Sequence, residues 1–358
     1  MMVKRAKEGA SLEALARMAI PLLKEASRQC PRTGRGAKPK ILDWFMGVLI
    51  MIAVFKRKKS KSAQFRFLSD PVHRHLLLSI TGQAGFPSRS TFFDRYRRAH
   101  LLFQKGIEIQ GRQAIEEGIT DPKHVAVNKS LLPARGSAWH KRDRQAGKRP
   151  CGVDTQAAWG YSEHHGWVYG YSYEVVVSAT PGTTVFPLFA SADVASAAET
   201  RTFANKIDAL PTQVEAVLAD SGYDANVLGE RVEYDAQGRR TGRRFLCPEN
   251  PRNHGRTKTK PGGADSARAH SRQLRAKRKQ FYESRIGRRT YRRDSKTVEP
   301  FNSWLKALFE LNLNAWQRGL PNNQTQLLTS IFAYQLLVRY NHRRGRKNAR
   351  LRSIFDTL

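Results

Sequence analysis

The chain has few cysteines, few acidic residues and no long apolar run, and each shortage excludes a class of protein. Its 3 cysteines are widely separated. Because they form no C-x-x-C pair and no zinc-like spacing, we expect ordinary reduced thiols rather than a disulfide framework or a zinc site. The longest apolar run, from Trp44 to Phe55, is shorter than the roughly 20 residues that span a bilayer and lies inside the chain. A soluble, cytoplasmic protein is predicted.

Acidic residues are outnumbered, since 30 Asp and Glu stand against 63 Lys and Arg, for a formal net charge of +33 over 358 residues. A field of this sign attracts polyanions over a wide surface. Nucleic acid is therefore the first partner to consider, with a merely soluble or ribosome-associated basic protein as the alternative. The length allows two or three domains and a sizeable core.

Residues 1–120 predict an all-α domain, because helical periodicity covers residues 11–27, 41–56 and 90–117. The third segment begins with a turn and a capping pattern at Thr91 and Asp94. Its apolar face comprises Phe92, Tyr96, Ala99 and Phe103, and its basic residues are Arg89, Arg95, Arg97 and Arg98. A helix-turn-helix that binds DNA ends and a structural helix pair with a solvated basic face fit this pattern equally well.

From residue 124 the sequence alternates between short β-rich runs and helical stretches. We expect strands at residues 124–128, 166–178, 185–190, 214–219 and 243–247, with helices at 198–210 and 298–313. This order predicts an α/β core with a mixed sheet over residues 121–250, and a helical region over residues 297–358.

Residues 251–296 form a basic insertion that is poor in apolar residues. Such a segment cannot supply its own core, so it is either a flexible solvated insertion or a strap that becomes ordered on phosphate. We favour the strap, because it leads directly into the candidate site below. Its candidate DNA-binding residues are Arg272, Arg275, Lys277, Arg278 and Lys279.

Asp220 follows the apolar run 214–219 and precedes a Ser-Gly-Tyr-Asp turn. Ligands bind where strands end in open α/β sheets, which makes Asp220 a candidate for the chemical site. An Asp in this place also commonly caps the helix that follows, and this alternative stays open for Asp220 and Asp224.

The helix expected at residues 298–313 begins with Glu299 and Pro300, and proline is well tolerated in a first turn. Three- and four-residue spacing predicts a buried stripe of Phe301, Trp304, Leu305, Leu308 and Phe309, opposite a face with Glu299, Asn302, Ser303 and Lys306. The helix thus presents a carboxylate, with a cation two turns later. A Glu favoured by the helix dipole and a solvated Lys are the alternative.

These motifs resemble those of the DDE transposases of bacterial insertion sequences, in particular the group named after insertion sequence four. The resemblance runs over about residues 124–347. Segment 218–224 is similar to the family's second-Asp motif, and segment 298–306 is similar to its Glu-to-Lys helix. The resemblance implies an RNase H-like mixed-sheet catalytic core, here preceded by the all-α domain and carrying the basic insertion before its last catalytic helix.

The sequence departs from the family pattern ahead of Glu299. The family places a Tyr and an Arg at fixed distances before its Glu, whereas Arg292 and Ser295 occupy those positions here. Tyr291, Arg292 and Arg293 are close enough to substitute for this pair as DNA contacts.

A second departure concerns the first carboxylate. The family ends its first strand on Asp, whereas the run 124–128 ends on Asn128. Asp121 and Asp154 are less well placed, so we assign the first-carboxylate position to Asn128. Asparagine keeps an acceptor oxygen but loses the charge and turns N–H donors toward cations. We therefore expect weak metal binding and impaired cleavage.

The resemblance implies catalytic and metal-binding roles for Asn128, Asp220 and Glu299, with two Mg²⁺ or Mn²⁺ ions in the active Asp form. Lys306 joins the DNA-binding residues. The implied partners are double-stranded DNA, as transposon ends and target, and a second copy of the chain in a homodimeric synaptic complex, without a membrane. The implied location is the bacterial cytoplasm, in association with DNA.

Three functions follow as hypotheses. The first is a transposase that binds terminal inverted repeats and catalyses metal-dependent strand cleavage and transfer for an insertion sequence. The second is a catalytically inactive, transposase-derived DNA-binding or regulatory protein, which Asn128 keeps open. The third is an RNase H-like nuclease without joining activity.

Overall fold

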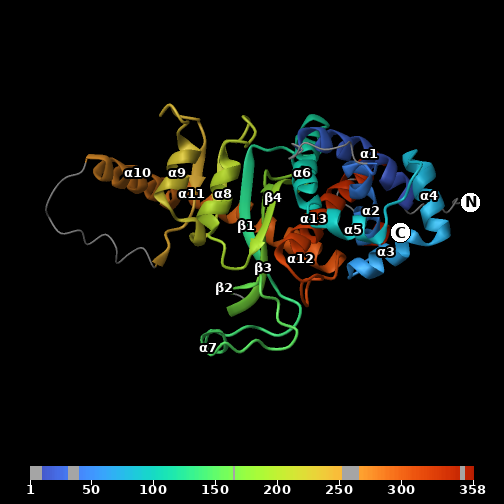
Figure 1. Ribbon diagram of the computed structural model, residues 1–358. Helices are drawn as coiled ribbons and strands as arrows, with labels where there is room; N and C mark the ends of the chain where they lie inside the picture. Colours follow the sequence, from blue (N-terminus) through green and yellow to red (C-terminus); the bar gives the residue numbers. More distant parts are fainter. Residues whose placement is uncertain (1–9, 31–39, 164–165, 252–265, 347–350) are drawn as a thin grey trace, which may run out of the picture.

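The computed structural model describes residues 10–30, 40–163, 166–251, 266–346 and 351–358. Its N-terminal region is entirely helical, as predicted (Figure 1). The helices are α1 (Leu12–Gln29), α2 (Asp43–Phe55), α3 (Lys61–Ser69), α4 (Pro71–Thr81), α5 (Arg89–Tyr96) and α6 (Ala99–Glu116). The single helix expected over residues 90–117 is wrong, because the chain breaks between α5 and α6. The capping residue of α5 is Ser88, whose hydroxyl accepts from the Thr91 amide at 3.3 Å.

One mixed sheet forms the centre of the molecule. Its strands are β1 (His124–Pro133), β2 (Ala158–Ser162), β3 (Gly166–Ser178), β4 (Pro187–Val194), β5 (Ala216–Ala219) and β6 (Arg244–Leu246). The order is β2-β3-β1-β5-β6, with β4 also paired to β3. β3 is antiparallel to β1, β2 and β4, whereas β5 lies parallel to both β1 and β6. β5 therefore ends at the same edge toward which β1 runs.

Helices cover both faces of this sheet (Figure 1). On one side lie α8 (Glu199–Ile207), the turn η1 (Ser221–Tyr223), α9 (Asn226–Glu233), α10 (Ser266–Glu283) and α11 (Arg285–Asp294). On the other lie the N-terminal helices, α12 (Val298–Leu308) and α13 (Leu320–Arg343). Short helices complete the fold. α7 (Lys141–Gln145) lies beyond the end of the sheet in Figure 1, η3 (Ser295–Thr297) directly precedes α12, and α14 (Leu351–Phe355) follows α13.

α13 fills the space between the N-terminal helices and the sheet. It contacts α6, α2 and β4. Gln335, which is fully buried, donates to the carbonyl oxygens of Ile107 at 3.0 Å and Pro187 at 2.8 Å, and so joins α13 to α6 and to the start of β4. One continuous apolar core results, running from Ala10 to Phe355.

The basic insertion is more ordered than its composition indicates. Residues 266–294 form α10 and α11, and α10 packs on α9 and β6. This packing differs from that of a fully solvated segment, and ordering of the strap on phosphate stays a prediction. Residues 252–265 lie outside the described part of the chain.

The arrangement confirms the predicted fold class: an RNase H-like mixed-sheet α/β core that follows an all-α region and carries a basic insertion before α12. Among the described residues, no helix is long and apolar enough to cross a membrane.

Candidate active site

Asn128 and Asp220 lie side by side where β5 ends against β1. The parallel pairing runs as far as Val127 and Ala219. The next residues on the two strands are Asn128 and Asp220, and neighbouring strands lie about 4.8 Å apart. Asp220 keeps an extended backbone, with φ −77° and ψ 177°, and so continues the direction of β5 for one residue.

The prediction that the first strand ends at Asn128 is wrong, because β1 continues to Pro133. Lys129 and Ser130 stay paired with β3. The Lys129 ammonium donates to two backbone carbonyl oxygens in the turn before α8, at 2.9 and 2.6 Å, so its charge is satisfied within the fold. The strand end beside Asn128 belongs to β5.

Asn128 faces away from α8. The next residue, Lys129, lies opposite Glu174 in the register of β1 and β3. Glu174 contacts α8 through a hydrogen bond from Lys206. Because side chains alternate along a strand, Asn128 points to the opposite face of the sheet. That is the face on which α12 lies (Figure 1).

Asp220 does cap the turn that follows it, since its Oδ1 accepts from the Gly222 amide at 2.8 Å. The capping alternative and a metal-binding role are compatible, because an ionised carboxylate offers further acceptor sites on both oxygens. Desolvation raises the pKa of Asp220, and the hydrogen bond from Gly222 opposes this shift. Nearby Asp224 accepts from Arg275 at 2.5 Å and from the Asn250 amide at 2.9 Å.

A buried carboxylate fixes the turn after Asp220. Glu174 is 2% exposed and accepts three hydrogen bonds: from Lys206 Nζ at 2.5 Å, from Thr202 Oγ1 at 2.6 Å and from Tyr223 OH at 2.9 Å. Tyr223 belongs to η1, directly after Asp220. This network ties β3, α8 and the Asp220 turn together. Sequence reasoning missed it, because its members come from separate elements with no common spacing.

Glu199 is a second carboxylate beside Asp220 that sequence reasoning missed. It begins α8, and its carboxylate lies so close to Gly222 that a Cβ there would meet Oε2 at 2.0 Å. Burial raises the pKa of Glu199 to about 7, and the negative charge of Asp220 adds to the shift. The candidate site thus holds more acidic groups than its motifs indicate.

We expect Glu199→Gln to stabilise the protein above pH 7. An acid whose pKa is raised by folding costs stability once it ionises, so the unmodified chain loses stability relative to the variant as the pH rises from about 4.5 to about 7. The difference in unfolding free energy should reach roughly 3 kcal/mol and vanish below this window. Urea denaturation in EDTA at several pH values measures it, and a difference that does not change with pH would contradict it.

Glu299 lies in the first turn of α12 and is exposed. The charged groups that act on Tyr291 of α11 include both Glu299 and Asp220. Burial raises the pKa of Tyr291 well above its ordinary value, and the nearby charges of Asp220 and Glu299 contribute to the shift. Both carboxylates therefore lie within electrostatic range of one phenol. The Tyr291 ring also packs edge-on against Tyr282, with centroids 5.2 Å apart.

Lys306 lies two turns further along α12. Its Nζ donates to the Leu131 carbonyl oxygen at 3.3 Å, which places α12 alongside β1. Burial lowers the pKa of this lysine. Lys306 is therefore a partly buried group held against the sheet rather than a fully solvated one.

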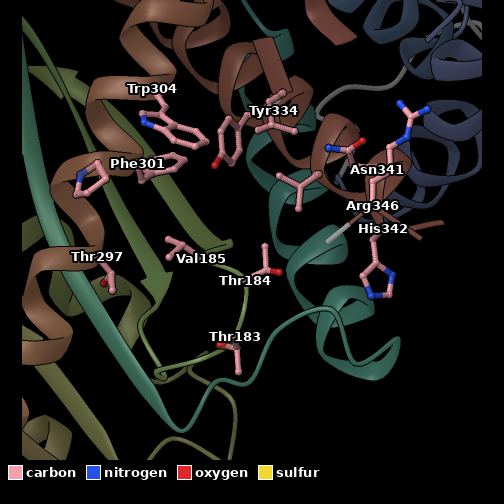
Figure 2. Close-up of a pocket in the computed structure, with 13 residues that line it drawn as sticks. Thr183, Thr184, Val185, Thr297, Phe301, Trp304, Tyr334, Asn341, His342 and Arg346 are labelled. Carbon is pink, nitrogen blue, oxygen red and sulfur yellow. The ribbon is translucent and has the colours of Figure 1, made fainter. Parts of the chain in front are cut away.

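The predicted apolar stripe of α12 is correct for Phe301 and Leu305 but wrong for Trp304, which is 50% exposed, while Asn302 is buried. The Trp304 ring lies instead at a pocket between α12, α13 and the turn before β4 (Figure 2). Phe301 and Tyr334 form its wall, with ring centroids 5.0 Å apart. Trp304 turns outward because this pocket, not the core, lies beside it.

Three of the insertion cations predicted to bind DNA are engaged by core acids. The ion pairs join Arg275 to Asp224 at 2.5 Å, Arg278 to Glu233 at 3.9 Å and Lys279 to Glu249 at 2.7 Å. Arg272, Lys277 and Arg292 are exposed, and the side chain of Arg293 lies outside the described part of the structure. The exposed members are the ones available to a phosphate backbone.

The basic residues of the N-terminal region also divide into residues that contact other side chains and residues that are exposed. Arg95 pairs with Asp43 at 3.2 Å, and the Arg89 guanidinium lies over the Phe93 ring at 5.2 Å. Arg97 and Arg98 are exposed at the break between α5 and α6. The predicted apolar face is confirmed, since Phe92, Tyr96, Ala99 and Phe103 are all buried.

Within the described residues, no three Asp, Glu, His or Cys side chains gather closely enough to hold a metal ion. The candidate donors are two carboxylates and the Asn128 amide oxygen. They are hard oxygen ligands, the kind that Mg²⁺ and Mn²⁺ prefer, but they carry one charge fewer than three carboxylates would.

Comparisons with known proteins identify the family of the chain. No curated protein matches the chain. A solved structure of the piggyBac transposase synaptic complex with hairpin DNA is similar at 11% identity, covering 99% of this chain and 80% of that one, with a TM-score of 0.44. The family model described as a transposase DDE domain matches residues 112–336, a segment that includes Asn128, Asp220 and Glu299. This chain therefore belongs to the family of transposases with a DDE domain.

Proposed function

We propose that the chain derives from a transposase that binds terminal inverted repeats and catalyses metal-dependent strand cleavage and transfer for an insertion sequence. The observation that carries the proposal is the meeting of the β1 and β5 positions Asn128 and Asp220, with Glu299 on a helix that Lys306 joins to β1. We assign end binding to residues 1–120, the catalytic core to 121–250, DNA contacts to 251–296, and the Glu helix to 297–358.

The geometry of α12 supports Glu299 as the third member of the site. The helix is anchored at Leu131 by Lys306, and Glu299 lies seven residues before this lysine. Those residues rise about 10 Å, and the strand from Asn128 to Leu131 also covers about 10 Å. A helix running along β1 can therefore bring Glu299 level with Asn128.

Asp220, Glu299 and the Asn128 oxygen would hold divalent cations, as Mg²⁺ or Mn²⁺. Bound there, the cations would supply Lewis-acid charge for phosphodiester hydrolysis and transesterification. The residues of the chain orient the site, because Tyr223 and Glu174 hold the Asp220 turn. The Asn128 amide supplies no charge, so this chain should bind DNA ends and cleave them poorly.

Asn128 also favours a second function, a transposase-derived DNA-binding or regulatory protein that has lost catalysis. Both functions require duplex DNA as a partner, and the first requires a homodimer that pairs two ends. Strand transfer separates these functions from a plain nuclease. With a pre-cleaved transposon end, a target plasmid and Mg²⁺, the Asn128→Asp chain should yield joined product. Cleavage of the plasmid without joining would instead indicate the nuclease.

Removing the exposed cations of α10 should flatten the salt dependence of DNA binding. For Arg272→Gln combined with Lys277→Gln, we expect the slope of log Kd against log salt to fall by up to about 2 units, at about 0.9 per lost phosphate contact. In the matched control, Arg275→Gln with Lys279→Gln, the slope should change less, because core acids already occupy both cations. Fluorescence anisotropy at several salt concentrations measures it. An unchanged slope in the first variant would make α10 a solvated surface only.

A further inference from the structure

A basic arm, defined here as residues 134–152, leaves the sheet at the candidate-site edge. It starts directly after Pro133, the last residue of β1, and includes α7. In Figure 1 it extends from the end of the sheet, away from the helical layers. Pro133 lies five residues beyond Asn128, about 17 Å along the strand. DNA that occupies the candidate site has this arm as its neighbour.

The charge of the arm is almost entirely positive. Its single acidic residue is Asp143, and its cations are Arg135, Lys141, Arg142, Arg144, Lys148 and Arg149. All of these cations are exposed, and in the part of the chain that the structure describes none of them forms an ion pair. The insertion differs, because there Arg275 and Lys279 are paired with core acids.

The arm is nevertheless held in a defined position. The Trp139 indole N–H donates to the Lys148 carbonyl oxygen at 3.0 Å, which closes the arm on itself. The Trp159 indole N–H of β2 donates to the Trp139 carbonyl oxygen, also at 3.0 Å. Trp139 and Trp159 pack against a small buried cluster that includes Tyr169 and Tyr171. The fold thus fixes these like charges close together, although they repel one another.

The base of the arm is anchored as well. Asp154 is 4% exposed, and its Oδ2 accepts from the Tyr171 hydroxyl at 2.6 Å and from the Gly319 amide at 2.9 Å. These contacts tie the returning end of the arm to β3 and to the start of α13. A cationic surface that the fold holds in position and that acids do not neutralise is already organised for a polyanion, so binding requires little further ordering.

We propose that the basic arm binds the phosphate backbone of duplex DNA beside the position where the strand is cut. The inference rests on the proposed function and deepens it, because it adds a DNA-binding surface distinct from α5, α10 and α11. The ring of Trp139 packs inward, so the arm offers phosphate-binding cations rather than a surface for base stacking. Its contacts are therefore independent of base sequence.

The salt dependence of binding tests the proposal. The arm variant carries Lys141→Gln, Arg142→Gln, Lys148→Gln and Arg149→Gln, and the control variant carries Arg201→Gln, Arg231→Gln, Arg239→Gln and Arg352→Gln. Both lose the same charge, but the control residues lie outside residues 1–120 and are already ion-paired, with Asp193, Asp208, Asp235 and Asp356. With a fluorescent duplex of random sequence, the arm variant should lose up to about 3.5 units of slope and the control less than about one. Equal losses, or no loss in the arm variant, would overturn the proposal.

An exposed thiol within the arm allows the position of bound DNA to be tested by cross-linking. Cys151 is exposed, whereas Cys30 and Cys247 are partly buried. A duplex with a disulfide-activated tether on one phosphate should cross-link at Cys151, as identified by peptide mass spectrometry. The cross-link should disappear in Cys151→Ser and weaken in the arm variant. Absence of any cross-link at Cys151 would count against the arm.

The experiments distinguish an error in the proposed function from an error in the role of the basic arm. If Asn128→Asp gives no cleavage but the arm variant loses slope, the proposed function is wrong and the arm is a DNA-binding surface. If cleavage is restored and the slope is unchanged, the arm alone is wrong. Thermal unfolding of each variant shows whether a loss of binding reflects a loss of folding.

Discussion

Replacing Asn128 with aspartate is expected to raise Mg²⁺-dependent cleavage of terminal-repeat duplexes roughly a hundredfold to a thousandfold. The new carboxylate would lie beside Asp220 and restore the missing charge. Charge stabilisation by a correctly held cation is worth several kcal/mol in the transition state, and about 1.4 kcal/mol corresponds to a factor of ten. The measurement is a gel-based cleavage assay of both proteins at equal occupancy of DNA.

The control is Asn128→Asp combined with Asp220→Asn, which has the same net charge as the unmodified chain but places the acid on β1 instead of after β5. Its cleavage should stay at the unmodified level, because two adjacent carboxylates are needed. Efficient cleavage by the unmodified chain, or no gain from Asn128→Asp, would refute the assignment of this position. Binding of the repeats should change little in any of these variants.

The second large effect concerns stability. Lys206→Met should lower the free energy of unfolding by about 3 to 5 kcal/mol, because it leaves Glu174 buried without its cation. The two side chains are only 7% and 2% exposed and lie 2.5 Å apart. Urea denaturation at neutral pH measures the loss. The Asp220 turn should loosen at the same time, since Glu174 also holds Tyr223.

An exposed ion pair serves as the comparison. Arg231 and Asp208 lie 2.7 Å apart at the surface, and Arg231→Gln should cost less than about 1 kcal/mol. The double change Lys206→Met and Glu174→Leu should recover part of the stability, because it removes the uncompensated charge as well. A loss below about 1 kcal/mol for Lys206→Met would show that water reaches this pair.

Local patterns predicted the parts of the site that depend on short stretches of chain. β3 has the predicted bounds, Asp220 follows an apolar strand, and α12 carries Glu299 in its first turn. Each of these follows from alternation, capping or helical spacing within about ten residues. The predicted buried stripe of α12 is wrong only at Trp304, whose side chain lies at a neighbouring pocket and not in the core.

What the sequence could not predict depends on distant partners. β1 passes through Lys129 because carbonyl oxygens beyond β4 satisfy its ammonium group. α10 packs on the core where Arg275 meets Asp224, 51 residues earlier in the chain. α13 shows little amphipathic pattern because it is buried on nearly all sides, and its glutamines bond to groups on other elements. None of these contacts produces a periodic pattern in the sequence.

The central position of α13 also sets an order of events during synthesis. Residues 320–343 are translated long after α2, α6 and β4, yet they supply the surface on which all three pack. Until that segment leaves the ribosome, the earlier elements expose the apolar faces that α13 will cover. A nascent chain is therefore aggregation-prone, and we expect the common core of α2, α6 and β4 to close only after residue 343 has left the ribosome.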